Sequence, residues 1–386
     1  MEIHGDYITP KLKEMETSVF AVISQMADEN NAINLSQGFP DFAISEELIE
    51  MVTYHMKQGR NQYAPMKGLP ELRDMIKKLY LRNHNANYDA DKEITITAGA
   101  TQALFTAISA FVRENDEVIV FEPAYDAYAP AIEMNGGIAK HCTMKPPDFH
   151  IDWDEVIKTV NGKTRMIIIN SPHNPTGTVL SVNDMVELQK IIEDREIIVV
   201  SDEVYEHLVF DGKEHQSAAR FPALAEKSFV IGSFGKTLHA TGWKMGYAIA
   251  PAYLMSEFRK MHQYVVFAVN TPIQYAITDY LNKYPNLSGL AEFYQEKRNY
   301  FLDKMKDSRF KMIPSKGTYF QLLDYSSVSG KNDKEFTEEL IKKHGVAAIP
   351  LSPFYQSEDK QLKILRFCFA KKNETIDKAA KILCRI

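Results

Sequence analysis

A lysine that follows a predicted strand is the first candidate for chemistry in this sequence. Lys236 lies in the string SFGKT, directly after an apolar run at 228–232. An amine at the end of a strand can form an imine if burial or neighbouring cations lower its pKa. The alternative for any single lysine is an exposed surface position. A phosphate-binding P-loop is excluded, because the glycine that it requires is replaced by Val230 here and by Ile157 before the similar GKT at 162–164.

Two further polar clusters follow apolar runs. Asp202 comes after the run at 196–200, and Tyr205 lies three residues further on, about one helical turn. A carboxylate there could keep a heteroaromatic ring nitrogen protonated, whereas helix capping is its ordinary alternative role. Asn174 follows the run at 165–169 in the string SPHNPTG, where two prolines restrict the turn that aims its amide.

Two sites could bind anions. Gly99, Ala100 and Thr101 stand before a predicted apolar helix at 103–112, and small residues at a helix start allow a phosphate to approach free backbone N–H groups. Arg366 interrupts an otherwise apolar strand at 363–369. A guanidinium there needs an anion, which could be a substrate carboxylate or an internal acidic partner.

The elements that carry these residues predict an α/β fold. Five apolar runs without polar alternation are typical of parallel strands covered on both faces, and they lie at 93–97, 117–121, 165–169, 196–200 and 228–232. Ligands of such sheets bind beyond the carboxyl ends of the strands, where these polar residues stand. The last third predicts a long helix at 290–306 and β-like pieces at 317–323 and 363–369, which indicates a smaller α+β lobe.

Composition narrows the function further. The 386 residues predict two domains, or one with a lobe, and 45% hydrophobic with 25% charged residues is typical of a globular protein. A net charge of -6 gives no basic footprint for nucleic acid or a membrane surface. Three scattered cysteines argue against disulfides or a zinc site, so we expect no metal and a reducing cytoplasm. No dinucleotide, HExxH or GxSxG motif occurs, and the first 13 residues lack the apolar core of a signal peptide.

Taken together, the ordered motifs resemble the fold-type I, class I aminotransferases, which depend on pyridoxal 5′-phosphate (PLP). The resemblance is carried by NPTG at 174–177, DEVY at 202–205, SFGK at 233–236, GWKMG at 242–246 and RFCF at 366–369. Within that class the chain looks like the subgroup of kynurenine aminotransferase, glutamine transaminase K and bacterial methionine aminotransferase. That narrower match is carried by LSQGFPDF at 35–42, NQY at 61–63 and AIP at 348–350.

The resemblance implies a mostly parallel seven-stranded sheet sandwiched by helices, with a smaller α+β domain. It implies an N-terminal arm with part of the small domain at 1–45, a large PLP-binding domain at 46–285 and a C-terminal small domain at 286–386. It also implies a cytoplasmic homodimer with active sites at the subunit interface.

Residue roles follow from the same resemblance. Lys236 would form the Schiff base and shuttle the α-proton, Asp202 would pair with the ring nitrogen, and Asn174 and Tyr205 would hydrogen-bond the ring oxygen. The phosphate would be held by Ala100, Thr101, Ser233 and Lys244, the last where many relatives carry arginine, and by Tyr63 of the neighbouring subunit. Tyr125 would stack on the ring. Gly38 and Arg366 would bind the substrate carboxylate, and Asn174 would also contact the substrate. Phe20, Tyr264, Phe267 and Phe354 would surround its side chain.

The implied reaction is ping-pong transfer of an amino group from an L-amino acid to a 2-oxo acid. A second arginine of the kind that binds a distal carboxylate is not found in a matching motif, so a neutral, apolar or aromatic donor is favoured. Methionine is the first choice, with Gln, Phe, Tyr, His and kynurenine as further donors. A cysteine-S-conjugate β-lyase is the nearest alternative. A PLP-binding regulator of transcription would need a DNA-binding domain, and only about forty residues precede the Phe42 motif.

Overall fold

Seven strands form the largest sheet in the computed structural model, which describes residues 11–12, 17–287, 289–356 and 362–386. Their order across the sheet is β2 (Ile94–Thr97), β8 (Gly246–Ile249), β7 (Ser228–Ser233), β6 (Ile198–Asp202), β5 (Thr164–Asn170), β3 (Glu117–Glu122) and β4 (Ile138–Thr143). β8 runs antiparallel to β2 and β7, and the other neighbours are parallel. The predicted mostly parallel, seven-stranded α/β sheet is therefore confirmed.

Helices cover both faces of this sheet, which explains the apolar runs. Successive strand residues point to opposite faces, so Val200 packs with α4 (Ala100–Phe111) and α10 (Ala252–Val265), while Val199 packs on the other side with α7 (Val182–Ile192). The runs did not indicate β4 and β8. β4 is a half-exposed edge strand that carries Lys140 and His141, and β8 has the sequence GYAI, in which Gly246 and Ala248 weaken the strand pattern.

The remaining helices of this part are short to medium in length. They are α2 (Glu46–Lys57), α3 (Pro70–His84), α5 (Tyr128–Met134), α6 (Trp153–Thr159), α8 (Pro222–Ala225), α9 (Phe234–Thr237) and α11 (Thr271–Lys283), with 3-10 turns at Ala218–Arg220 and Thr241–Trp243. α9 follows β7 without a loop and carries Lys236.

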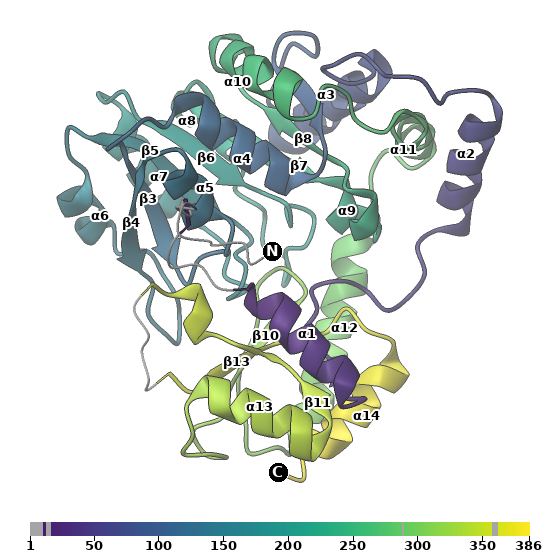
Figure 1. Cartoon of the computed structure of the whole chain (residues 1–386), viewed down its shortest axis with the longest axis vertical. Helices are drawn as coiled ribbons and strands as arrows, with labels where there is room; N and C mark the ends of the chain where they lie inside the picture. The colour runs from purple at the N-terminus through teal and green to yellow at the C-terminus, as the bar shows by residue number, and fades with distance from the viewer. Residues whose placement is uncertain (1–10, 13–16, 288, 357–361) are drawn as a thin grey trace, which may run out of the picture.

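A second, smaller sheet lies in the lower half of Figure 1 with the C-terminal helices. It is antiparallel in the order β12 (Ile349–Pro350), β13 (Ile364–Cys368), β10 (Phe320–Asp324) and β9 (Lys311–Ile313). Around it lie α12 (Leu290–Met305), α13 (Asp333–His344), α14 (Asn373–Leu383) and a 3-10 turn at Ser352–Phe354.

The N-terminal segment joins this smaller part. α1 (Val19–Glu29) leads into β1 (Ile33–Asn34), which pairs in parallel with β11 (Val346–Ala347). The predicted helix at 290–306 and both predicted β pieces correspond to α12, β10 and β13. The domain boundaries at 45 and 285 stay predictions.

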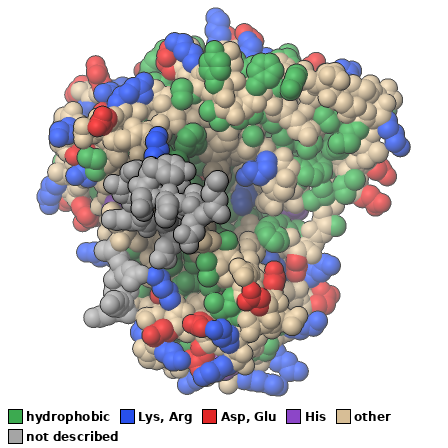
Figure 2. All heavy atoms as spheres, viewed as in Figure 1, with side chains coloured by type: hydrophobic (Ala, Val, Ile, Leu, Met, Phe, Trp, Pro, Cys, Tyr) green, Lys and Arg blue, Asp and Glu red, His purple; other side chains and the backbone are tan. Residues whose placement is uncertain are grey.

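Charged side chains of both signs are interspersed around the face in Figure 2, and hydrophobic side chains gather at the right, near α2 and α11. Ile49, Tyr54 and Met56 of α2 are exposed. Among the described residues, the helices are too short or too polar to cross a membrane.

Candidate active site

Lys236 lies in a cavity at the carboxyl ends of β6 and β7. Its ammonium donates to the phenol oxygen of Tyr319 at 2.9 Å and to the carbonyl of Gly38 at 3.3 Å. Burial lowers the pKa of Lys236 to about 8, and the cations Arg366 and Lys244 contribute in the same direction. About a tenth of the amine is therefore neutral at pH 7, and the hypothesis of an exposed surface lysine is wrong.

Asp202 is the last residue of β6 and lines the same cavity. One carboxylate oxygen accepts a hydrogen bond from the Tyr128 hydroxyl at 2.6 Å, and the other accepts from the Val204 amide at 3.3 Å. Burial raises the pKa of Asp202 to about 6. A cationic group beside this carboxylate would be stabilised at neutral pH.

Tyr205 and Asn174 approach the cavity from the ends of neighbouring strands. Tyr205 is buried, and burial raises the pKa of its phenol. The Asn174 amide N–H donates to the side-chain oxygen of Asn170 at 2.8 Å, and the Asn170 side chain donates to the carbonyl of Asp202 at 2.8 Å. Asn170 thus joins the ends of β5 and β6, next to the segments that carry Asn174 and Tyr205.

An anion cradle closes one end of the cavity. Its lining includes Gly99, Ala100, Thr101, Ser233 and Lys244. α4 begins at Ala100 without a side-chain cap, so its first N–H groups and positive dipole end remain available. Gly99 has a φ of +80°, and a Cβ atom there would lie 3.4 Å from Lys244 Cε.

A second glycine keeps the cradle close to the sheet. A Cβ atom at Gly246 would lie 2.9 Å from the backbone nitrogen of Ala100. Only glycine allows β8 to support the start of α4 at this distance. Hydroxyl, amide and ammonium donors therefore converge on one space, which fits a phosphate.

Arg366 lies on β13 with only 1% of its surface exposed. It donates to the Asn174 side-chain oxygen at 2.8 Å and to the carbonyl of Ser36 at 3.0 Å, while its Nε has no hydrogen-bond partner. Burial lowers its pKa to about 10, so it stays cationic at pH 7. None of the ion pairs among the described residues involves Arg366. In the described part of the chain no carboxylate is in direct contact with Arg366, and Asp126 attracts it only through space.

Aromatic rings surround this guanidinium. Its central carbon lies 3.9 Å from the ring centre of Phe320, 5.1 Å from that of Phe20 and 5.6 Å from that of Phe354. The Phe320 ring also packs under Gly38, where a Cβ atom would lie 2.8 Å from it. Gly38, Phe20 and Phe354 are thus brought together with Arg366, and their roles in substrate binding stay predictions.

Three expected site residues lie elsewhere on this chain. Tyr63 and Tyr264 are 82% and 86% exposed, and Phe267 is 49% exposed and packs edge-on against Tyr63 at 5.3 Å. None of the three lines the cavity that holds Lys236. Their proposed roles stay predictions. By contrast, Tyr125 lines that cavity, and burial raises its pKa.

The sequence reading missed three residues of the site. Tyr128 holds Asp202, Tyr319 holds Lys236, and Asn170 ties β5 to β6. Asn170 ends an apolar run, and Tyr128 lies one helical turn after Tyr125, so both offered a weak positional signal. Tyr319 offered none, because its contact joins segments 83 residues apart.

Fold and site define an α/β enzyme that presents a reactive amine, a buried carboxylate and an anion cradle at the carboxyl edge of its sheet. Residues 30–383 match the family described as aminotransferase class I and II. The chain belongs to this family and is an aminotransferase, so the resemblance seen in the motifs is confirmed.

Individual relatives cover nearly the whole chain. It is 47% identical over 374 residues to methionine aminotransferase of Escherichia coli (strain K12), which covers 97% of each chain. It is 31% identical to human kynurenine–oxoglutarate transaminase 3 over 97% of this chain and 89% of that one.

Solved structures agree with these sequence matches. An Escherichia coli protein with a methionine aminotransferase function superposes with a TM-score of 0.96 at 46% identity, covering 98% of this chain and 99% of that one. N-Succinyldiaminopimelate aminotransferase of Mycobacterium tuberculosis gives 0.94 at 34% identity, with the same coverage.

Proposed function

We propose that this aminotransferase binds PLP and prefers L-methionine as amino donor, with Gln, Phe, Tyr, His and kynurenine as further donors and a 2-oxo acid as acceptor. The observation that carries the proposal is the convergence of Lys236, Asp202 and the anion cradle on one cavity. The methionine preference is supported by the Escherichia coli methionine aminotransferase match, seen both in sequence and in a solved structure.

The residues present fit this cofactor. The cradle of Ala100, Thr101, Ser233 and Lys244 would hold its phosphate, and Asp202 would pair with its ring nitrogen. Asn174 and Tyr205 would donate to the ring oxygen, and Tyr125 would stack on the ring. When bound, PLP supplies an aldehyde that captures amines and a protonated ring that withdraws electrons from the substrate α-carbon.

Each protein group then has a defined task. Lys236 Nζ, neutral in part because of its lowered pKa, would take the proton from the substrate α-carbon and pass it to the cofactor, and would carry a proton in the reverse direction in the second half of the reaction. Tyr319 holds this amine in place between proton transfers. Arg366 binds the substrate carboxylate and, with Asn174, fixes the α-carbon beside Nζ.

The side-chain preference is supported by the ring pair around Arg366. Phe20 and Phe354 lie edge-on at 5.7 Å and present apolar surface beside the carboxylate site. A thioether packs well against aromatic edges, whereas a second carboxylate would be desolvated there without a partner. Neutral donors are therefore favoured over acidic ones.

We further propose a cytoplasmic homodimer in which Tyr63 reaches the phosphate of the neighbouring subunit. The exposure of Tyr63, Tyr264 and the apolar residues of α2 supports an interface on this side of the molecule.

Replacement of the lysine tests the proposal, and the chain contains a matched control. Lys236→Ala is expected to abolish the visible absorption of bound PLP and to reduce methionine transamination by about 10³-fold or more. Lys163→Ala removes the exposed lysine of the other GKT string and is expected to change neither. A panel of amino acids, scored by conversion of bound PLP to its aminated form, should rank methionine first. Full activity in Lys236→Ala would overturn the proposal.

A further inference from the structure

The segment that carries Asp202 and Tyr205 has a second face that the reaction does not use. Asp202 and Tyr205 line the cavity, whereas Glu203 and Glu206 do not. Glu203 is completely buried, and Glu206 is 8% exposed. A carboxylate in such a position is costly unless its oxygens are hydrogen-bonded, so the partners of Glu203 indicate its purpose.

Three hydrogen-bond partners hold the Glu203 carboxylate. One oxygen accepts from the Ser201 hydroxyl at 2.7 Å and from the Ala218 amide at 2.9 Å, and the other lies 2.8 Å from Nε2 of His215. The His215 side chain is itself buried, and its Nδ1 has no hydrogen-bond partner. His215 is therefore oriented by Glu203 and not by a competing acceptor.

The bond between Ser201 and Glu203 constrains the residue between them. In an extended backbone, residues two apart point to one face and the intervening residue points to the other. The hydrogen bond between Ser201 and Glu203 holds both side chains on the face of the sheet away from the cavity. The side chain of Asp202 therefore points to the other face, where the cavity lies.

The backbone of the segment is anchored on both sides as well. The Glu203 amide donates to the carbonyl of Ile231 on the β7 side at 2.9 Å, and Ser171 donates to the carbonyl of Asp202 on the β5 side at 3.1 Å. The Glu206 amide donates to the carbonyl of Glu203 at 2.8 Å and closes the turn that contains Tyr205. Asp202, Glu203 and Tyr205 thus belong to one hydrogen-bonded turn, so a shift of its backbone at Glu203 would be passed to both cavity residues.

We propose that Glu203, held by His215 and Ser201, is a positioning residue that aims Asp202 and Tyr205 at the cofactor. The proposal rests on the PLP function proposed above. Residues that orient the ligands of a metal site change its affinity or activity by about tenfold to a hundredfold when they are removed, and we expect an effect of similar size here.

Glu203→Gln tests this role, because its amide nitrogen would face one of three donors. In the full chain stripped of PLP and titrated with it, we expect the dissociation constant to rise at least about tenfold, with a displaced visible band. The His215 pair sharpens the test. His215→Phe removes the donor and should weaken PLP binding in the same way, whereas His215→Gln keeps an N–H and should restore most of it.

A merely structural role would lower thermal stability without changing PLP affinity, so unfolding of the apoenzyme is followed in parallel. Glu117→Gln is the control. This buried carboxylate lies at the start of β3, away from the carboxyl ends of the strands where the cavity is, and it accepts a hydrogen bond from Asn161 at 2.7 Å. It should lower stability and leave PLP affinity within about twofold of the wild type. If Glu203→Gln fails to fold, the PLP affinities of His215→Phe and His215→Gln test the proposal instead.

Folded Glu203→Gln or His215→Phe with PLP affinity and spectrum unchanged would overturn the proposal. Failure of the wild-type chain to bind PLP would instead refute the proposed function itself, so the two outcomes are distinguishable.

Discussion

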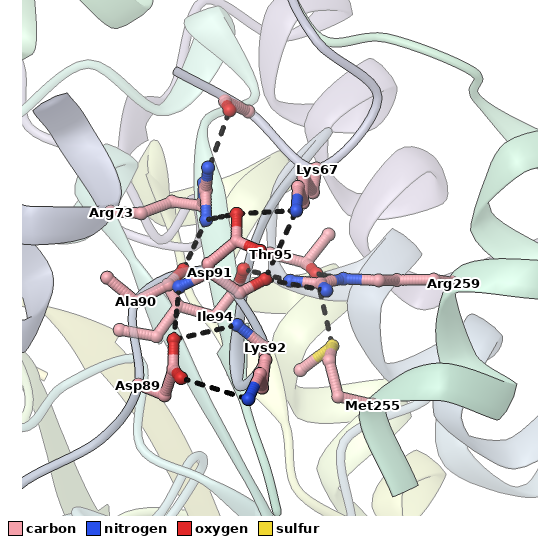
Figure 3. Close-up of polar contacts among 11 residues, drawn as sticks. Lys67, Arg73, Asp89, Ala90, Asp91, Lys92, Ile94, Thr95, Met255 and Arg259 are labelled. Atoms are coloured by element: carbon pink, nitrogen blue, oxygen red, sulfur yellow. Dashed lines mark hydrogen bonds and ion pairs between the residues drawn. The ribbon is translucent and has the colours of Figure 1, made fainter. Parts of the chain in front are cut away.

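Two buried arginines of this protein have opposite surroundings. Arg73 of α3 is 3% exposed, and Figure 3 shows it enclosed by acceptors near the edge strand β2. It donates to the carbonyls of Gly68 and Ala90 and forms an ion pair with Asp91 at 3.3 Å. Arg366 is buried even more deeply, yet it has two neutral acceptors, an unpaired Nε and stacked aromatic rings.

The difference separates a structural guanidinium from one that awaits a ligand. A structural arginine has a resident carboxylate, as Arg298 does with both oxygens of Asp211 at 2.6 and 2.7 Å. At Arg366 the aromatic rings fix the guanidinium plane without neutralising it. Its missing anion is the one that an amino-acid substrate brings.

Arg366→Met should show the largest effect, and it tests most directly whether Arg366 differs from Arg73 in serving the substrate. Methionine roughly preserves the volume but loses the carboxylate site, so kcat/KM for methionine should fall by about 10²- to 10³-fold, the range for one partner of a buried charge pair. The change leaves two neutral acceptors without their donor, the Asn174 side-chain oxygen and the Ser36 carbonyl, but it breaks no ion pair, so the free energy of unfolding should fall by less than for the Arg73 variant below.

Steady-state kinetics and denaturant unfolding of the same preparation measure both quantities. Arg366→Lys serves as the comparison variant, because it keeps the charge but loses the pair of parallel N–H donors that a guanidinium offers a carboxylate. A strongly destabilised Arg366→Met protein with normal kcat/KM would show that the arginine is structural.

Arg73→Met should have the reverse effect and comes second in size. It leaves the carbonyls of Gly68 and Ala90 without their donor, and Asp91 keeps only Lys67 as an ion-pair partner. We expect the free energy of unfolding to fall by about 2–3 kcal/mol, with KM for methionine unchanged. Urea unfolding monitored by circular dichroism, beside the kinetics, provides the check; a raised KM with intact stability would contradict the assignment.

The contrast between these arginines also shows what the sequence could predict. Lys236, Asp202 and Asn174 were found because each lies at the carboxyl end of an apolar strand or shortly after it, and the carboxyl ends of parallel strands meet at one edge. For Arg366 the sequence left the anion open between a substrate and an internal acid. Only the packing of the described chain distinguished them, through the partners of the guanidinium.

Contacts set by register could not be predicted in this way. Phe320 stacks on Arg366 because β10 and β13 pair Leu322 with Arg366, which places Phe320 diagonally across on the same face. Asn170 reaches Asp202 because their strands pair at these residues. Neither register follows from the composition of one strand. The exposed positions of Tyr264 and Phe267 likewise depend on where α10 ends, at Val265.

The smallest expected effect is on pH dependence. The guanidinium of Arg366 and the amine of Lys236 should lose their protons over different pH ranges. The pKa values of Arg366 and Lys236 are lowered to about 10 and about 8, so between pH 6.5 and 9 Arg366 stays largely charged while Lys236 loses its proton. Only the neutral amine attacks an aldehyde. The rate of PLP uptake by the apoenzyme should therefore rise about eightfold from pH 6.5 to 7.5 and less than about twofold from pH 8.5 to 9.5.

Stopped-flow absorbance with PLP measures this uptake, and the aminated cofactor is the control. That form has no aldehyde, so its binding should not follow the titration of Lys236. A flat PLP profile would mean that Lys236 is already neutral at pH 6.5. The neighbouring cations Arg366 and Lys244 would then depress its pKa more strongly than the burial and charges described above indicate.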